Sequence, residues 1–262
     1  MELSELNIYP VKSLAGISLD QSIVDGFGLQ NDRRWMLVDS QGKMLTQRKL
    51  ARMGLIQPRV TPQGIHLSAP GRDDIQITTA DLANARKVQV WNDVCNAYDA
   101  GDQAAQWLSE FLAIDCRLSY FPDDEVRQLD QRYAQPNDTT AFSDGFPFLL
   151  ISQASLDDLN RRLDTPVSMS RFRPNLVISG SEAFEEDQWK HIRIGDMTFR
   201  LVKPCSRCVI PSIDPDTGEK GKEPLYTLSQ YRKRDNRVYF GQNVIADGTG
   251  ELAVGMAMEV LE

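Results

Sequence analysis

Two cysteines three positions apart, Cys205 and Cys208, are the residues of this sequence best suited to chemistry. Lys203 and Arg207 stand beside them, and neighbouring cations favour the thiolate over the thiol. Apolar residues alternate over 197–202 just before the pair, which is typical of a strand. We therefore expect the two thiols at the end of a strand, on a loop and in a cationic setting. A soft thiolate in such a place suits a soft or high-valent metal.

Three other interpretations of the cysteine pair are open. A structural zinc site needs about four ligands, but the other two cysteines are isolated and the only histidines are His66 and His191. A thioredoxin-like pair should open a helix after a strand, whereas Pro211 and the turn sequence Asp-Pro-Asp-Thr-Gly at 214–218 follow here. A buried thiol with no function is common for cysteine, although the polar flanks of the pair argue against it.

The cysteine loop is one of six segments that together carry a family resemblance. They are Tyr-Pro-Val-Lys-Ser at 9–13, Asp-Arg-Arg-Trp at 32–35, Ser-Asp with Pro-Phe within 143–148, Phe-Arg-Pro-Asn at 172–175, the cysteine loop with its turn at 205–218, and Phe-Gly-Gln at 240–242. In this order they resemble MOSC-domain proteins, above all the mitochondrial amidoxime-reducing component and the bacterial YcbX-type proteins. The resemblance spans nearly the whole chain.

The resemblance implies an α+β, β-rich fold in two parts. Residues 1–121 would form the MOSC-associated N-terminal β-rich lobe, and residues 122–262 the β-barrel-like MOSC domain. The first strand is a candidate to join the second part, because the resemblance implies a bound cofactor and places Lys12 and Ser13 near it. The segment 122–140 is polar and contains two prolines, which predicts a long surface loop at the boundary.

The resemblance also implies a molybdenum cofactor, Mo-molybdopterin, whose pterin dithiolene holds the metal and which carries a terminal phosphate. Cys208, the second cysteine of the pair, would then be the metal ligand, and Cys205 would have a supporting role. Asp144 is the residue expected to handle protons. The cofactor-binding residues implied are Lys12, Ser13, Arg33, Ser143, Gly145, Phe146, Arg173, Asn175, Ser206, Arg207 and Asn243.

Asp144 has two interpretations. If burial raises the pKa of its carboxyl group, it can relay a proton to the substrate. Alternatively, it only caps a turn within Ser143-Asp144-Gly145. The family has a different residue pair where this chain has Gly145 and Phe146, so backbone contacts there can persist, whereas side-chain contacts and substrate range would change.

By this resemblance we predict a molybdenum oxidoreductase that reduces N-hydroxylated compounds, such as amidoximes, hydroxylamines and N-hydroxylated bases, in a detoxifying role. Its electrons would come from a ferredoxin-like protein, a flavoprotein or a cytochrome, in trans or on a missing C-terminal domain, because the cysteine spacing of a plant-type ferredoxin is absent. The alternative is a non-redox carrier or sulfurtransfer module that holds the cofactor or a persulfide at Cys205 or Cys208. A β-barrel binding module without chemistry is a third option, and pyridoxal phosphate is not expected.

Composition limits the classes of protein that this chain can belong to. It has 262 residues, of which 41% are hydrophobic and 25% charged, as in an ordinary globular protein of one large or two small domains. A net charge of −8 argues against a nucleic-acid partner, whose affinity comes mainly from phosphate neutralisation. No apolar run suits a membrane span or a signal peptide. Four unclustered cysteines predict a reducing compartment, and we predict a bacterial, cytoplasmic protein.

The elements that must position these residues follow from hydrophobic periodicity. Helical spacing predicts helices over 102–113, with Asp102 as N-cap, and after a capping box at 155–158, with a short helix over 225–231. A hairpin turn is expected at 40–43, leading into a short strand at 44–46. Alternating or short apolar runs predict strands over 3–9, 19–24, 34–38, 54–60, 65–68, 75–78, 87–91, 95–98, 116–121, 148–151, 176–179, 192–194, 197–202, 238–240 and 258–261.

Overall fold

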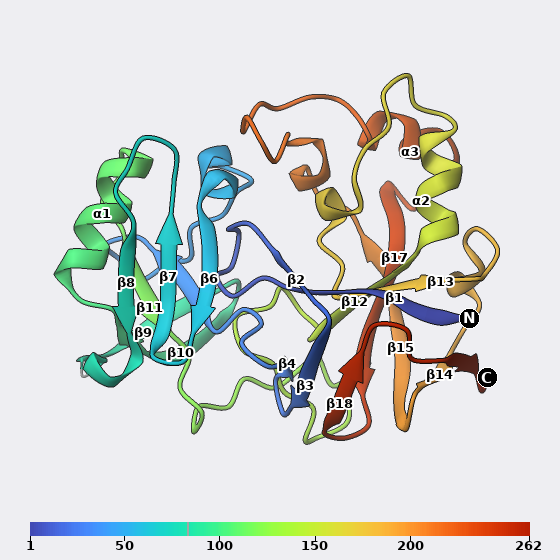
Figure 1. Ribbon diagram of the computed structural model, residues 1–262, viewed down its shortest axis with the longest axis horizontal. Helices are drawn as coiled ribbons and strands as arrows, with labels where there is room; N and C mark the ends of the chain where they lie inside the picture. The colour runs from blue at the N-terminus through green and yellow to red at the C-terminus, as the bar shows by residue number, and fades with distance from the viewer. Residues whose placement is uncertain (83) are drawn as a thin grey trace.

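The computed structural model describes residues 1–82 and 84–262 and confirms the β-rich α+β fold. Figure 1 shows two lobes side by side, with the N-terminal strand running into the lobe that holds the C-terminus. The helices are α1 Asp102–Leu112, α2 Gln153–Asn160 and α3 Leu225–Tyr231, with 3₁₀ helices at Ala51–Leu55, Thr79–Asp81, Met169–Phe172, Glu185–Asp187 and Ile210–Ser212. The strands are β1 Glu2–Ile8, β2 Ile17–Leu19, β3 Gln21–Asp25, β4 Gly28–Leu29, β5 Trp35–Val38, β6 Gln57–Thr61, β7 Gly64–Ser68, β8 Ile75–Thr78, β9 Asn84–Val90, β10 Asp93–Asp99, β11 Arg117–Tyr120, β12 Phe148–Ser152, β13 Leu176–Ser179, β14 His191–Ile194, β15 Met197–Ser206, β16 Lys233–Arg234, β17 Arg237–Ala246, β18 Gly250–Ala253 and β19 Met258–Val260.

The C-terminal lobe is built on one nine-stranded sheet. Its strand order is β19-β14-β15-β17-β12-β13-β1-β2, and β16 pairs with β17. The first strand therefore lies among strands that come much later in the chain. The sheet curls back on itself, because Leu3 N donates to Met256 O at 3.0 Å and Met258 N donates to Met1 O at 2.9 Å. These bonds join the β19 end to β1 and give the lobe its barrel-like form.

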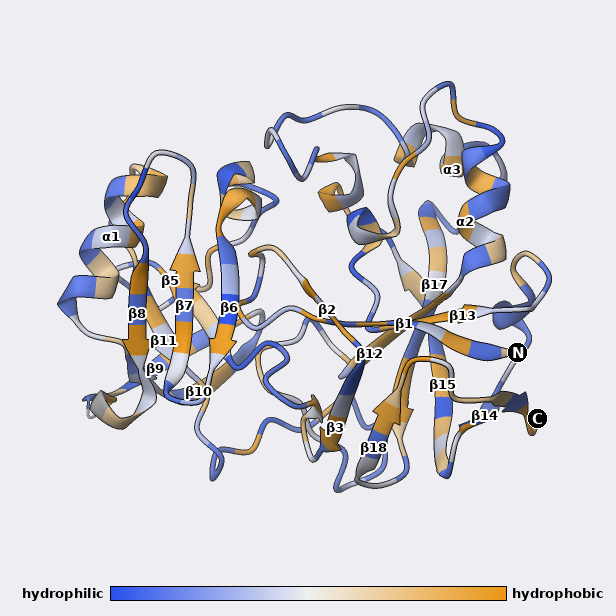
Figure 2. Cartoon of the chain, in the orientation of Figure 1, coloured by the Kyte–Doolittle hydropathy of each residue, from blue (hydrophilic) through white to orange (hydrophobic). Residues whose placement is uncertain are grey.

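The N-terminal lobe contains a four-stranded sheet, β5-β11-β10-β9, and a three-stranded sheet, β6-β7-β8. Helix α1 buries Ala104, Trp107, Leu108 and Phe111 in the core of this lobe, because these residues recur at helical spacing on one face. Figure 2 shows apolar residues gathered on the strands and on one side of α1, and polar residues on the connecting loops. Within residues 1–82 and 84–262, no helix has the length and apolar content needed to cross a bilayer.

Both long helices begin differently from the prediction. Asp102 is not the N-cap of α1: Gly101 holds that position with φ 87°, and the Asp102 carboxylate accepts from Arg117 Nη2 at 2.8 Å instead. Helix α2 begins before the predicted capping box. Its N-cap is Ser152, whose Oγ accepts from Ser155 N at 3.1 Å. The hydroxyl of Ser152, which precedes the predicted capping box, therefore caps α2.

Several strands also differ in extent. The predicted strand 19–24 is divided into β2 and β3, a 3₁₀ helix precedes β6, and β4, β16 and β18 were not predicted. Isolated bridges at 43 and 44 replace the predicted strand 44–46. Strands β15 and β17 each run for ten residues, well beyond the predicted ranges. The register of β15 shifts between Leu201 and Lys203 and again between Pro204 and Ser206. Such bulges let a strand continue past a proline, which brings Cys205 inside the strand.

Asp99 ties the strands of the N-terminal lobe together. Its carboxylate accepts from Arg86 Nη1 at 2.6 Å, from Arg117 Nε and Nη2 at 2.6 and 2.7 Å, and from Gly101 N at 2.8 Å. Its side chain is only 7% exposed. Burial opposes ionisation, but these hydrogen bonds outweigh it and hold the pKa of Asp99 below its usual value.

We expect Asp99→Asn to lower the free energy of unfolding by about 2–3 kcal/mol, less than the full cost of breaking a buried pair because the arginines are partly exposed. Because the folded-state pKa is lowered, this stabilisation is present above the unfolded pKa of about 3.9 and is lost as pH falls through the folded value. Urea unfolding at about pH 7 and pH 3 measures both effects. The control Asp102→Asn removes a carboxylate that is 97% exposed; an equal loss in both variants would contradict this account.

Candidate functional site

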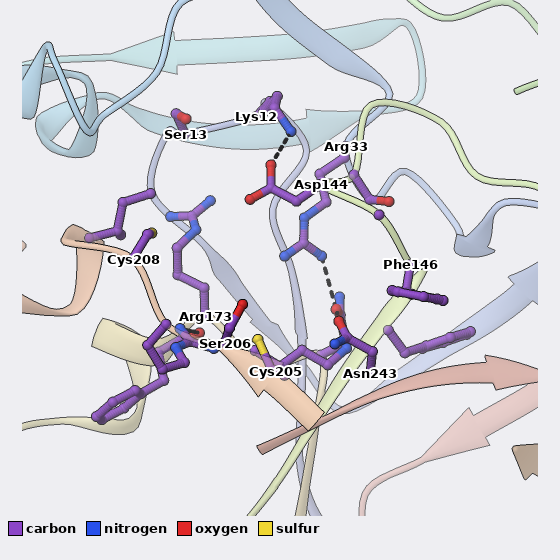
Figure 3. Close-up of a pocket in the computed structure, with 18 of the residues that line it drawn as sticks. Lys12, Ser13, Arg33, Asp144, Phe146, Arg173, Cys205, Ser206, Cys208 and Asn243 are labelled. Carbon is purple, nitrogen blue, oxygen red and sulfur yellow. Dashed lines mark hydrogen bonds and ion pairs between the residues drawn. The ribbon is translucent and has the colours of Figure 1, made fainter. Parts of the chain in front are cut away.

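A hollow lies where the end of β15 meets the loops after β1 and before β12 and β13 (Figure 3). The structure brings all thirteen residues predicted for the site to its lining; their individual roles stay predictions. Seven further residues line it as well, among them Arg48 from the N-terminal lobe. The predicted residues are Lys12, Ser13, Arg33, Ser143, Asp144, Gly145, Phe146, Arg173, Asn175, Ser206, Arg207, Cys208 and Asn243.

The two cysteines lie at the end of β15, as predicted, but their environments differ from the expectation. Cys205 lies within the strand, and half-buried Cys208 follows it on the loop. Arg207 Nη1 donates to Cys205 Sγ at 3.2 Å, and its Nη2 donates to Phe172 O at 2.6 Å. The cation expected beside Cys208 therefore contacts Cys205. Lys203 points elsewhere, with its Nζ 4.6 Å from the centre of the Tyr133 ring.

The turn after the cysteines has the predicted chemistry. Asp214 Oδ1 accepts from Asp216 N and Thr217 N, both at 3.0 Å, and Gly218 has φ 73°. Arg171 Nη2 pairs with the other oxygen of Asp214 at 2.8 Å. The loop that carries Cys208 is therefore fixed at both ends, by β15 on one side and by this Asx-turn on the other.

Positive charge dominates the lining of the hollow. Burial lowers the pKa of Lys12 to about 8 and that of Arg173 to about 10. The Nε atoms of Arg48 and Arg207 are buried and have no hydrogen-bond partner within the described chain. Buried donors without partners are costly, so this arrangement favours an anionic ligand. The five cations are Lys12, Arg33, Arg48, Arg173 and Arg207.

Asn175 holds Arg33 in position from behind. Arg33 pairs with the buried carboxylate of Asp32, and its Nη1 donates to Asn175 Oδ1 at 2.9 Å. The same oxygen accepts from Leu149 N at 3.2 Å, while Asn175 Nδ2 donates to Asn7 O at 3.0 Å. Because its acceptor and donor are both used inside the protein, Asn175 is better described as a positioning residue than as a ligand donor.

Arg173 separates this hollow from a second one. Its guanidinium lies 4.1 Å from the centre of the Tyr9 ring, and its Nη1 donates to Leu14 O at 2.6 Å. Burial raises the pKa of Tyr9 to about 12, so the ring stays neutral under the cation. The candidate site measures about 130 Å³ and the hollow beyond Arg173 about 280 Å³.

Asp144 forms an ion pair at the mouth of the hollow. Its carboxylate accepts from Lys12 Nζ at 2.5 Å, Arg48 Nη2 at 3.1 Å and Trp91 Nε1 at 3.3 Å, and the contact with Lys12 is visible in Figure 3. The side chain is 58% exposed, and the nearby cations, Lys12 first, lower the pKa of Asp144 well below its usual range. The condition considered for proton relay, a pKa raised by burial, is therefore not met. The turn-cap alternative finds no support, since no backbone N–H donates to this carboxylate in residues 1–82 and 84–262.

Comparisons with known proteins agree with the fold and the site. Residues 1–115 match the MOSC N-terminal beta barrel domain, and residues 137–259 match the MOSC domain. Mitochondrial amidoxime-reducing component 1 of Mus musculus is 37% identical over 97% of this chain and 80% of its own length, and that of Homo sapiens is 36% identical over 97% and 81%. Molybdenum cofactor sulfurase of Oryza sativa is 32% identical over 99% of this chain but 35% of its own length.

The two matching domains, with the cysteine loop between the lobes, define a MOSC-domain protein. The chain belongs to the family of the mitochondrial amidoxime-reducing components, which confirms the resemblance. The matched domains leave residues 116–136 unassigned, so the boundary at 121/122 stays a prediction. These relatives are mitochondrial proteins of animals and a plant sulfurase, and they do not support the predicted bacterial, cytoplasmic origin.

Proposed function

We propose that the candidate site binds Mo-molybdopterin and that the chain uses it to reduce N-hydroxylated compounds. The observation that carries this proposal is a cationic hollow with a half-buried thiol, Cys208, at its edge. The names of the relatives, amidoxime-reducing component and molybdenum cofactor sulfurase, support the same cofactor and substrate class.

The residues of the site fit this group. A phosphate and a dithiolene are anionic, and the hollow offers five cations against the carboxylates of Asp144 and Asp32. The hollows on the two sides of Arg173, about 130 and 280 Å³, together reach the lower end of the ~300–1,000 Å³ typical of ligand sites. Cys208 supplies a soft ligand for the metal.

Binding cannot rest on the phosphate alone. A charge-assisted hydrogen bond contributes about 1.5–3 kcal/mol, whereas association costs about 4–15 kcal/mol. Three or four donors would therefore barely offset that cost. The bond from Cys208 to the metal and the burial of the pterin must contribute much of the remaining affinity.

Reduction of an N–OH group consumes two electrons and two protons: the N–O bond breaks, an N–H bond forms, and the oxygen leaves as water. When bound, the cofactor supplies the two-electron chemistry. The chain must position the substrate and deliver protons. Lys12, with a pKa lowered to about 8, is largely protonated near neutral pH yet acidic enough to donate. Asp144 stays ionised and orients this ammonium group at 2.5 Å.

The electron donor belongs to the proposal as well. We propose a separate ferredoxin-like, flavin or cytochrome-type protein, and we keep the cytoplasm as the proposed location. A non-redox carrier is the second candidate function, because the chain is 32% identical to a molybdenum cofactor sulfurase. In that case Cys205, with Arg207 beside it at 3.2 Å, would be the first residue to examine for a persulfide.

Turnover of benzamidoxime tests the proposal. The protein would be purified from a host that makes the cofactor, supplied with a chemical electron donor, and assayed for conversion to benzamidine. Turnover is the expected result. Bound cofactor without turnover would favour the carrier, and protein without cofactor from such a host would contradict both the reductase and a cofactor carrier.

Arg173→Met should weaken cofactor retention by about 10–100-fold without unfolding the protein. The change removes one charge-assisted bond worth about 1.5–3 kcal/mol but keeps an unbranched side chain beside Tyr9. Cofactor-free protein should keep nearly the same Tm, because removal of a half-buried charge offsets the loss of the hydrogen bond to Leu14 O. Cofactor content after dialysis and thermal unfolding measure the two effects. Arg161→Met, at a side chain that is 69% exposed, is the control; a collapse of Tm in cofactor-free Arg173→Met would show a structural role.

A further inference from the structure

A third hollow, here called the outer hollow, lies in the N-terminal lobe beside the candidate site. Its volume is about 630 Å³, well within the ~300–1,000 Å³ typical of small-molecule sites. It shares Thr46 and Arg48 with the lining of the candidate site. A molecule whose reacting end lies near Cys208 can therefore extend past Arg48 into the outer hollow.

The outer hollow is lined by half-buried apolar residues around one indole. Met44, Leu45, Leu50 and Ile114 supply the apolar side chains, and Trp91 supplies the ring. The other three tryptophans of the chain are at most 8% exposed, whereas Trp91 is half-buried and lines the hollow. An aromatic face with apolar neighbours favours a flat ring as ligand.

The backbone at Trp91 supports a functional reason for this residue. Trp91 and Asn92 form the two-residue turn between β9 and β10, since Val90 pairs with Asp93. The φ of Trp91 is 55°. In two-residue hairpin turns, a positive φ is usually found at Gly, Asn or Asp. A tryptophan is a poor choice for that turn, and local strain of this kind gathers at binding sites.

Contacts with the candidate site fix the indole. Trp91 Nε1 donates to Asp144 Oδ1 at 3.3 Å, and the Arg48 guanidinium lies 4.4 Å from the centre of the indole. Arg48 also pairs with Asp144 at 3.1 Å. The same three side chains therefore join the outer hollow to the site of the proposed chemistry.

The rim of the outer hollow is positive, although the chain carries a net charge of −8. Lys43 and Lys49 are exposed there beside Arg48, and neither lysine has an ion pair in the described part of the chain. The one carboxylate of the lining, Asp39, already accepts from the backbone N–H groups of Gln41 and Lys43, both at 2.9 Å. The rim therefore attracts an acidic group and repels a cationic one.

We propose that the outer hollow binds the body of the substrate, a flat aromatic group that carries an acidic substituent, while the N–OH end reaches the candidate site. The inference rests on the proposed function for the reaction itself. Beyond that reaction, it names the features of the substrate that the outer hollow recognises. The ring stacks on Trp91, and Lys43 and Lys49 attract the acidic end.

Binding without turnover tests this directly. The holo-protein, without any electron donor, would be titrated with biphenyl amidoximes that carry either a 4′-carboxylate or a 4′-aminomethyl group. We expect the acidic probe to quench Trp91 fluorescence and to bind about 5–10-fold more tightly than the cationic probe at low salt, a difference that shrinks at about 0.5 M salt. Trp91→Phe should remove the quenching and weaken binding. Equal affinity for the two probes, or quenching that survives Trp91→Phe, would overturn the proposal.

Charge reversal provides the matched comparison. Lys43→Glu with Lys49→Glu should reverse the preference between the two probes, whereas Lys233→Glu with Arg234→Glu makes the same change in net charge on exposed β16 and should leave the preference intact. An unchanged preference in the first double variant would overturn the proposal.

Steady-state kinetics with an electron donor provide a second readout. The Lys43→Glu, Lys49→Glu variant should raise KM for the acidic biphenyl substrate several-fold and leave kcat and benzamidoxime turnover almost unchanged. Probe binding without any turnover would contradict the proposed function alone, and benzamidoxime turnover without the charge preference would contradict only this inference.

Discussion

Cys208→Ser is expected to remove one sulfur ligand from the bound molybdenum and to lower reductase turnover by about 10³-fold or more. Loss of a group that merely supports a metal ligand lowers metal affinity or activity by about 10–100-fold, and loss of the ligand itself should lower them further. A factor of 10³ corresponds to about 4 kcal/mol of transition-state stabilisation. A serine hydroxyl is a hard, weakly acidic ligand and replaces a soft thiolate poorly.

Cys205→Ser is the matched control for this prediction. Cys205 lies in β15 next to a buried cluster of the C-terminal lobe, and its sulfur accepts from Arg207. A serine oxygen can still accept that hydrogen bond, so metal content and most of the activity should remain. X-ray absorption of both variants counts the sulfur ligands. The same number of sulfur ligands in wild type and Cys208→Ser, or a loss confined to Cys205→Ser, would refute the assignment.

Lys12→Met and Asp144→Asn are each expected to lower turnover by about 10²–10⁴-fold, the usual contribution of a positioned acid or base. The two groups share one hydrogen bond of 2.5 Å, so they should act as a unit. The double variant should then be no slower than the slower single variant. Independent effects that simply add in the double variant would contradict a shared role, and a fully active Asp144→Asn would exclude this carboxylate from proton delivery.

The pH profile of kcat separates proton delivery from cofactor binding by Lys12. Because the protonated amine is the donor, activity should be present below the pKa of Lys12, about 8, and lost above it. Burial lowers this pKa and Asp144 raises it, so Asp144→Asn should shift the loss of activity to lower pH. Cofactor content must be measured in each variant. A profile that keeps its shape while activity follows cofactor content would show that Lys12 only binds the cofactor.

Much of the fold around the site could be predicted from local patterns. The runs at 148–151 and 176–179 are short and apolar, and the structure places β12 and β13 there. Local patterns do not predict pairing. Strand β1 lies against β13, with Ser4 Oγ donating to Val177 O across 173 positions. Only the family resemblance indicated that the segments near Lys12, Arg173 and Cys208 would converge.

The pKa values of the site residues could not be predicted, because they depend on which side chains lie close together in three dimensions. Proton relay by Asp144 was considered on the condition that burial raises its pKa, but Lys12 and Arg48, which lie 132 and 96 positions away, keep the carboxylate ionised. Arg48 was missed because the residues around it form no family-like motif. Trp91 was missed because a tryptophan at the end of a predicted strand is usually part of the core.

Metal and pterin analysis of protein purified from a host that makes the cofactor would show whether this hollow holds Mo-molybdopterin. We expect about one molybdenum and one pterin per chain, as for a resident cofactor, with a marked loss of both in Arg173→Met. If the protein carries neither molybdenum nor pterin, although the same host loads a control molybdenum enzyme in parallel, the hollow does not hold this cofactor.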